Sequence, residues 1–259
     1  MGHLAHYFST LNHSFTNLEI NNNSLMKKLI IVLLSIVGSF CSINAKTASE
    51  VFADVIMNNG NEYANVGIKL PKGWDKKVKI IADGQKIDVA ADSITQIVFW
   101  HIKNPDNKQL ICWREYALFD PETGEYHADD KFLRKKGLFE KQWFSLHHPA
   151  EYADVWIAFA YINADEKSIS FSSNLSSPYF FHKKSDKLFV HVPFARLHPG
   201  MTREWLMAFF GDDDVLAKTL EDKNELYDRG RKGAMRNGTV FTPFKYEDIA
   251  DNYVPGRKN

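Results

Sequence analysis

The chain has 259 residues, of which 44% are hydrophobic and 25% are charged. This composition is that of a folded protein, and it excludes a disordered tail, a collagen-like fibre and a coiled coil. Lys plus Arg and Asp plus Glu each number 32, so the formal net charge is zero and gives no reason to expect nucleic acid or an anionic membrane as the main partner.

Residues 26–45 have the features of a secretory signal peptide. Two lysines precede an apolar run from Leu29 to Phe40, and the small residue Ala45 follows it. The run lies within the ~7 to 15 residues of a signal-peptide core and is shorter than the ~20 residues that span a bilayer. We therefore expect cleavage after Ala45 and export across the inner membrane, to the periplasm or the outer membrane. A buried apolar helix is the alternative for this segment.

The preceding segment, residues 1–25, is rich in Asn, Ser and His and has no apolar periodicity. We interpret it as a misannotated start or a disordered leader and exclude it from the fold. Cys41 lies beside the expected cleavage point, but Phe40 stands where a lipoprotein signal generally has a small residue. If Cys41 leaves with the signal peptide, Cys112 is the only thiol of the mature chain, and core burial must stabilise the fold without a disulfide.

Residues 46–103 are expected to form a small N-terminal β-domain, because short runs of strand-forming residues alternate with turn signals. Asp83-Gly84 between two such runs predicts a two-residue hairpin, since both turn residues need positive φ. Five short strands in about fifty residues favour a small antiparallel barrel or sandwich. The expected strands are Val51 to Met57, Glu62 to Leu70, Lys77 to Ala82, Gln85 to Ala90 and Ile97 to His101.

Residues 104–259 are expected to form a second β-rich domain that ends in helices. Thr202 is the expected N-cap of the first helix, Asp212 or Asp213 that of a helix over 215–220, and Tyr246 to Tyr253 forms a last short helix. The expected strands are Leu110 to Leu118, Gln142 to His147, Val155 to Ile162, Ser168 to Ser173, Tyr179 to Lys183 and Lys187 to Val192. The predicted fold class is therefore mainly β with short C-terminal α-helices, in two antiparallel strand-rich blocks of the small barrel or sandwich type.

Two parts of the chain resemble a known group of proteins. Val55 to Gly60, Val78 to Gly84 and Ile94 to Val98 follow a pattern of alternating apolar strands and Asn/Asp-Gly turns that is common in uncharacterised secreted proteins of Bacteroidetes-type Gram-negative bacteria. The tail, Phe209 to Asp214 with Tyr246 to Ala250, is similar to the helical ends of the same group. The resemblance implies a secreted β-protein and brings no activity, cofactor or site residue with it.

Adjacent His147 and His148, with Glu151 and Asp154 nearby, are the first candidates for a metal site. Neighbouring residues of a strand point to opposite faces, whereas known zinc motifs place their ligands on one face, so we expect a surface pair without a metal.

Three further groups have a structural interpretation. His182 and His191 lie on strands joined by a turn and are expected to pack across a hairpin. Cys112 lacks the context of a reactive thiol and is expected in the core. Asp212 to Asp214 lack the D-x-D-x-D-G spacing of a calcium loop and are interpreted as helix caps. Because no nucleophile elbow, P-loop or G-x-G-x-x-G motif occurs, we expect no cofactor and no metal.

Because no catalytic or cofactor motif occurs, binding at the surface is the function that the sequence favours. The basic, Gly-containing stretch from Arg229 to Arg236 is interpreted first as a solvated loop, and the alternative is that it binds an acidic polysaccharide or a lipid head group. Most of a set of aromatic residues are expected in the core, and the alternative is that some of them offer exposed ring faces to a sugar; the set is Trp100, Trp113, Trp143, Trp156, Tyr179, Phe180 and Phe181. The candidate ligand-binding residues are Trp143, Trp156, Tyr179, Arg229, Arg231, Lys232 and Arg236.

The sequence therefore predicts an exported, non-catalytic binding or cell-envelope interaction protein. Its expected partner is a glycan, an anionic envelope lipid or another envelope protein, and the mature chain is expected to have no transmembrane segment. One alternative is an envelope hydrolase of the glycosidase type, because paired carboxylates leave no local sequence signature. Another is a structural partner of an envelope protein, which would present a large exposed apolar patch.

Overall fold

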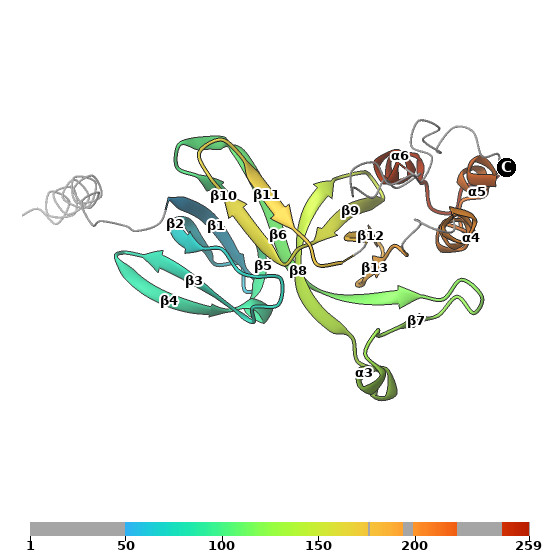
Figure 1. The fold of residues 1–259 in the computed structure, drawn as a ribbon, viewed down its shortest axis with the longest axis horizontal. Helices are drawn as coiled ribbons and strands as arrows, with labels where there is room; N and C mark the ends of the chain where they lie inside the picture. The colour runs from blue at the N-terminus through green and yellow to red at the C-terminus, as the bar shows by residue number, and fades with distance from the viewer. Residues whose placement is uncertain (1–49, 176, 194–198, 222–244, 259) are drawn as a thin grey trace, which may run out of the picture. The chain divides into compact units, whose positions relative to one another are not determined.

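The computed structural model describes residues 50–175, 177–193, 199–221 and 245–258. The expected leader 1–25, the signal peptide 26–45 with Cys41, and the basic stretch from Arg229 to Arg236 lie outside the described residues. The described chain is mainly β, as the sequence predicts, with one large sheet and a separate hairpin (Figure 1).

The strands are β1 (Val51–Met57), β2 (Glu62–Lys69), β3 (Lys77–Ala82), β4 (Gln85–Ala90), β5 (Ile94–His101), β6 (Asn104–Phe119), β7 (Tyr126–His127), β8 (Glu140–His148), β9 (Ala153–Ala158), β10 (Tyr161–Ala164), β11 (Ile169–Ser172), β12 (Tyr179–Lys183) and β13 (Phe189–His191). The helices are α3 (Lys131–Lys136), α4 (Pro199–Phe209), α5 (Asp214–Glu221) and α6 (Tyr246–Asn252), and η1 (Ala91–Ser93) is a 3-10 turn.

Five strands close into a small barrel. Strands β6, β8, β9, β12 and β13 follow one another as antiparallel neighbours, and β13 returns to pair with β6. An alternating path through an odd number of strands leaves the first and last strand running in the same direction, so the closing pair has to be parallel. This pair aligns Phe189 with Tyr116 and Val190 with Ala117.

The long strand β6 joins the two strand-rich blocks. Its first part pairs with β5 and its later part with β13, and beyond β5 the sheet continues through β1, β2 and β3 to β4. Strands β5 and β6 therefore pair across the domain boundary predicted between residues 103 and 104, and residues 47–259 form one compact unit. The closed barrel belongs to the second block, whereas the first block extends the sheet.

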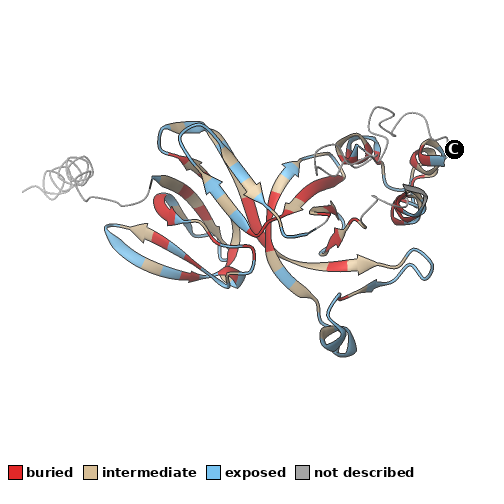
Figure 2. Cartoon of the chain, in the orientation of Figure 1, coloured by how far each residue is buried: buried red, intermediate tan, exposed pale blue. Residues whose placement is uncertain are grey.

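Side chains of β6 and β8 alternate between two cores. Figure 2 shows buried residues along the strands of both blocks. Trp113 and Trp143 pack in the core beneath β1 to β5, whereas their neighbours Cys112 and Phe144 lie in the barrel. Since successive residues of a strand point to opposite faces, each consecutive pair supplies one residue to each core. The hairpin of β10 and β11 packs on the first core through Ile162, Ile169 and Phe171.

The C-terminal helices cover the outer face of the barrel. Phe180 lies inside the barrel, and the next residue, Phe181, points outward to rings of α4 and α6. Thr202 lies within α4 and is not its N-cap, because the helix begins at Pro199, a residue whose fixed φ suits the first helical position. Asp213 caps α5 as predicted, since its Oδ1 accepts hydrogen bonds from the backbone N–H groups of Val215 and Leu216 at 3.1 and 3.0 Å.

The hairpin predicted at Asp83-Gly84 is confirmed. Both residues have positive φ, of 50° and 75°, and Ala82 pairs with Gln85 across the turn. Helix α3 was not expected, although Asp130 caps its start and Gly137, at φ 63°, ends it. This helix buries no residue, so it has none of the apolar periodicity by which a helix is recognised in sequence.

Candidate functional site

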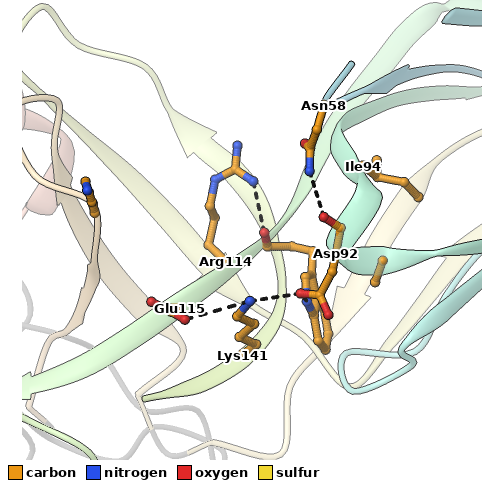
Figure 3. Close-up of a pocket in the computed structure, with 9 residues that line it drawn as sticks. Asn58, Asp92, Ile94, Arg114, Glu115 and Lys141 are labelled. Carbon is orange, nitrogen blue, oxygen red and sulfur yellow. Dashed lines mark hydrogen bonds and ion pairs between the residues drawn. The ribbon is translucent and has the colours of Figure 1, made fainter. Parts of the chain in front are cut away.

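A polar pocket opens where η1, β5, β6 and β8 meet (Figure 3). Its volume of about 260 Å³ is below the ~300 to 1,000 Å³ typical of sites for drug-sized ligands, and it suits a smaller molecule. Three cationic and two anionic side chains line it, and they come from distant parts of the sequence. The lining residues are Asn58, Ala91, Asp92, Ile94, Trp113, Arg114, Glu115, Lys141 and Lys187.

Asp92 organises one side of the pocket. Its Oδ1 accepts hydrogen bonds from Trp113 Nε1 at 3.0 Å and from Lys141 Nζ at 2.9 Å. Asn58 Nδ2 donates to the backbone oxygen of Asp92 at 2.7 Å and ties η1 to the turn after β1. The hydrogen bond with Lys141 lowers the pKa of Asp92 and raises the pKa of Lys141, so the ion pair favours the charged form of both groups.

Lys141 also forms an ion pair with Glu115, the second carboxylate of the pocket. Its Nζ lies 3.7 Å from Glu115 Oε1, and the dashed lines of Figure 3 join it to both acids. A glycosidase needs one carboxyl group that stays protonated near neutral pH to act as the general acid. Because the pKa of Asp92 is lowered, Asp92 does not fit the role of that acid.

Arg114 occupies another part of the pocket and is held by backbone oxygens. Its two terminal nitrogens donate to Trp113 O at 2.9 Å and to Thr95 O at 3.0 Å. In the described part of the chain, no carboxylate forms an ion pair with this guanidinium or with Lys187. A guanidinium has five N–H donors, so Arg114 retains donors and an unneutralised charge at the pocket.

His147 and His148 both reach helix α6. His147 Nε2 lies 2.6 Å from Glu247 Oε1, and His148 Nε2 lies 2.8 Å from Asp251 Oδ1. The expectation that the two rings point to opposite faces is wrong, because the pairing of β8 with β9 shifts register between Leu146 and His148. Glu247 and Asp251 stand four residues apart and so present both acids on one face of the helix.

Replacing Glu247 with Gln is expected to lower the free energy of unfolding at pH 7 by about 0.5 to 1 kcal/mol, because the pair is partly exposed. Burial acts to raise the pKa of Glu247, but hydrogen bonds from its own backbone N–H and from His147 outweigh this and leave the pKa below 4.5. The stabilisation is therefore present above pH 4.5 and is lost as the pH falls through the lowered pKa. Urea unfolding between pH 7 and pH 3 should show that the difference in free energy of unfolding between the unaltered protein and Glu247→Gln becomes smaller as the pH falls. A difference that stays constant over this range would contradict the prediction.

The aromatic residues proposed from sequence do not form an exposed binding surface. Trp143 is fully buried and donates its Nε1–H to Asp75 O at 2.8 Å, and Trp156 is 7% exposed in the barrel core. Core packing uses both rings, so neither offers a face to a ligand. Tyr179 is partly buried against His147 and Tyr246. The remaining candidates, Arg229, Arg231, Lys232 and Arg236, lie outside the described residues.

The other residues considered for chemistry have structural surroundings. His182 and His191 do not face each other: the ring nitrogen Nε2 of each pairs with a backbone oxygen, that of Asp186 and that of Ser177. Cys112 is buried as predicted, and this burial raises the pKa of its thiol to about 12. In the described ranges, no group of three or more His, Cys, Asp or Glu side chains is arranged to hold a metal ion.

Sequence reasoning missed the residues of the polar pocket. Asp92 stands in what reads as a simple turn, and Arg114 and Lys141 each lie in a strand with no motif around them. Only the pairing of β6 with β8, which sets Arg114 opposite Gln142 and Glu115 opposite Lys141, brings the cations together.

Comparisons of the chain with protein-family models, with curated proteins and with solved structures found no match. Of the helices in the described residues, none is long and apolar enough to cross a membrane.

Proposed function

We propose that this chain is an exported, non-catalytic binding protein whose polar pocket takes the anionic group of a small ligand. The observation that carries the proposal is the state of Arg114: its guanidinium is held by two backbone oxygens and has no carboxylate partner among the described residues. Export rests on the signal-peptide features of residues 26–45.

An arginine in this state suits a carboxylate or a phosphate. The planar guanidinium forms two parallel hydrogen bonds with such groups, and charge-assisted bonds of this kind are about twice as strong as neutral ones. Trp113 O and Thr95 O already hold the side chain in place, so binding costs little further conformational entropy. Lys187 adds a second cation to the pocket lining.

The rest of the pocket suits hydroxyl groups on the same ligand. Asp92 and Glu115 are both paired with Lys141, yet an ionised carboxylate has about four acceptor positions and retains some for a ligand. Asn58 adds an amide to the pocket lining. The geometry therefore favours a small, hydroxylated anion, which is the chemistry of a sugar acid or a sugar phosphate.

Replacing Arg114 with Gln is expected to weaken the binding of such an anion at least tenfold, because one charge-assisted contact is lost. The purified full chain would be titrated by calorimetry with galacturonate, glycerol 3-phosphate and sulfate, and with galactose as the uncharged counterpart of galacturonate. Galacturonate should bind more tightly than galactose to the unaltered protein, and this preference should disappear in Arg114→Gln.

Lys135→Gln is the matched control, because Lys135 is an exposed cation on α3 and is not among the residues that line the pocket. It should bind each anion as the unaltered protein does. Equal affinity of Arg114→Gln and the unaltered protein would refute the proposal, as would the absence of binding of all three anions at millimolar concentration.

A further inference from the structure

Two exposed aromatic rings lie side by side outside the pocket. Trp74, in the loop between β2 and β3, is 50% exposed, and Tyr161, at the start of β10, is 48% exposed. Their ring centroids lie 5.6 Å apart at an interplanar angle of 81°. Lys72 Nζ lies 6.0 Å from the centroid of Trp74 and 5.6 Å from that of Tyr161. We refer to Lys72, Trp74 and Tyr161 as the aromatic platform.

Hydrogen bonds on both sides fasten the turn that carries Trp74. Gly73 N–H donates to Ala160 O at 3.1 Å, and Trp143 N–H donates to Gly73 O at 2.8 Å. Asp75 closes the turn, because its carboxylate accepts from Lys72 N–H at 3.0 Å and its backbone oxygen accepts from Trp143 Nε1 at 2.8 Å. The turn therefore holds the backbone of Trp74 in place, and ligand binding would cost little conformational entropy of this segment.

Large aromatic side chains are usually buried in folded proteins, and the other tryptophans of this chain are no exception. Of the six tryptophans, Trp74 is the one that is exposed, and the others are partly or wholly buried. Exposed residues that lie close to the platform along the chain, Lys76 and Asn163, are polar, and so is Ser172, which pairs with Tyr161 across the hairpin. A protein interface would have a wider apolar centre, so an isolated aromatic pair in polar surroundings favours a small, polar ligand with an apolar face.

We propose that the aromatic platform binds a sugar ring that carries a carboxylate. The C–H face of a pyranose is flat and apolar and stacks on the face of an indole or phenol ring, while its hydroxyl groups stay in water. Lys72 has no carboxylate partner among the described residues, and its ammonium group lies where it can pair with an acid on that sugar. This inference rests on residues that the polar pocket does not use, so it stands or falls separately from the proposed function.

Titration of the purified full chain with hexagalacturonate tests the platform directly. Tryptophan fluorescence should change on binding, because stacking alters the surroundings of the exposed indole of Trp74. Trp74→Ala should abolish this change and weaken binding at least tenfold, while its melting temperature stays that of the unaltered protein. Trp74→Phe retains an aromatic face and should keep most of the affinity. Lys72→Gln should weaken binding of hexagalacturonate but not of its methyl ester, which has no charge.

Phe132→Ala is the matched control, since Phe132 is 63% exposed and also has a lysine over its ring, with Lys136 Nζ 4.2 Å from the centroid. It should bind hexagalacturonate normally. The inference is overturned if Trp74→Ala binds hexagalacturonate as tightly as the unaltered protein does, or if Phe132→Ala loses as much affinity for it as Trp74→Ala. It is also overturned if neither hexagalacturonate nor its methyl ester binds to the unaltered protein at millimolar concentration. Arg114→Gln, measured in parallel with galacturonate, reports on the pocket alone and separates failure of the proposed function from failure of the platform.

Discussion

Replacing Asp213 with Ala is expected to lower the free energy of unfolding by about 3 kcal/mol, the lower end of the cost of removing one partner of a buried ion pair, because the Arg257 side chain left behind is 32% exposed. The Asp213 side chain is fully buried, and Arg257 reaches it with Nε at 2.9 Å and a terminal nitrogen at 2.8 Å. The same carboxylate caps α5 and accepts a hydrogen bond from Val254 N–H at 2.9 Å. One residue therefore ties the segment that follows α6 to α5.

Urea unfolding at pH 7 measures this loss, and Asp214→Ala is its neighbouring control. Asp214 pairs with the exposed Lys258 at 3.3 Å, so its removal should cost about 1 kcal/mol or less. Burial acts to raise the pKa of Asp213, but the hydrogen bonds from Arg257 and from backbone N–H groups outweigh it and lower the pKa. The stabilisation is therefore lost as the pH falls through that lowered pKa. If the two substitutions lowered the free energy of unfolding equally at pH 7, the ion pair of Asp213 with Arg257 would not provide the stabilisation that we expect.

Replacing Gly73 with Ala is expected to lower the free energy of unfolding by about 3 kcal/mol, at the upper end of the cost of overpacking. A Cβ at this position would lie 1.8 Å from Phe159 O and 3.0 Å from the carbonyl carbon of the same residue. Because these are backbone atoms, no side chain can rotate to make room. The turn must move away from Ala160 and Trp143 and weaken the hydrogen bonds that Gly73 makes to them.

Thermal and urea unfolding measure this effect, and Trp74→Ala is the control at the next position. Trp74 is exposed, so its truncation should change the free energy of unfolding by about 0.5 kcal/mol or less. Gly73→Ala should also weaken binding of hexagalacturonate, because the platform loses its support. Wild-type stability in Gly73→Ala would mean that the turn is not packed against Ala160 as closely as the structure shows.

Local sequence patterns were sufficient to predict most strands. β1, β3, β4 and β12 have the bounds expected from their runs of strand-forming residues. Turn chemistry placed the Asp83-Gly84 hairpin, because positive φ at two successive residues is a local property. The apolar run Val155 to Ile162 was read as one strand, but it divides into β9 and β10, with Phe159 and Ala160 buried between them.

The binding surfaces could not be predicted in this way. Trp143 and Trp156 are candidates from sequence because aromatic composition does not show which rings are buried, and no sequence pattern distinguishes the exposed Trp74 from them. Asp92 and Lys141 lie 49 positions apart, and the tertiary fold sets their charged atoms 2.9 Å from each other. Likewise, the two histidines of β8 share a face only because the strand pairing shifts register beside them.

The sequence by itself determined the mainly β class, the hairpin turn and two adjacent candidates for the cap of α5, since these depend on residues within a few positions of one another. Only the tertiary structure decided the closure of the barrel, the single sheet across both blocks, the polar pocket and the aromatic platform. Each of these depends on which strands become neighbours. The strand pairing is determined by burial of side chains in two cores, to which β6 and β8 both contribute. No single segment of the chain contains the information that determines this pairing.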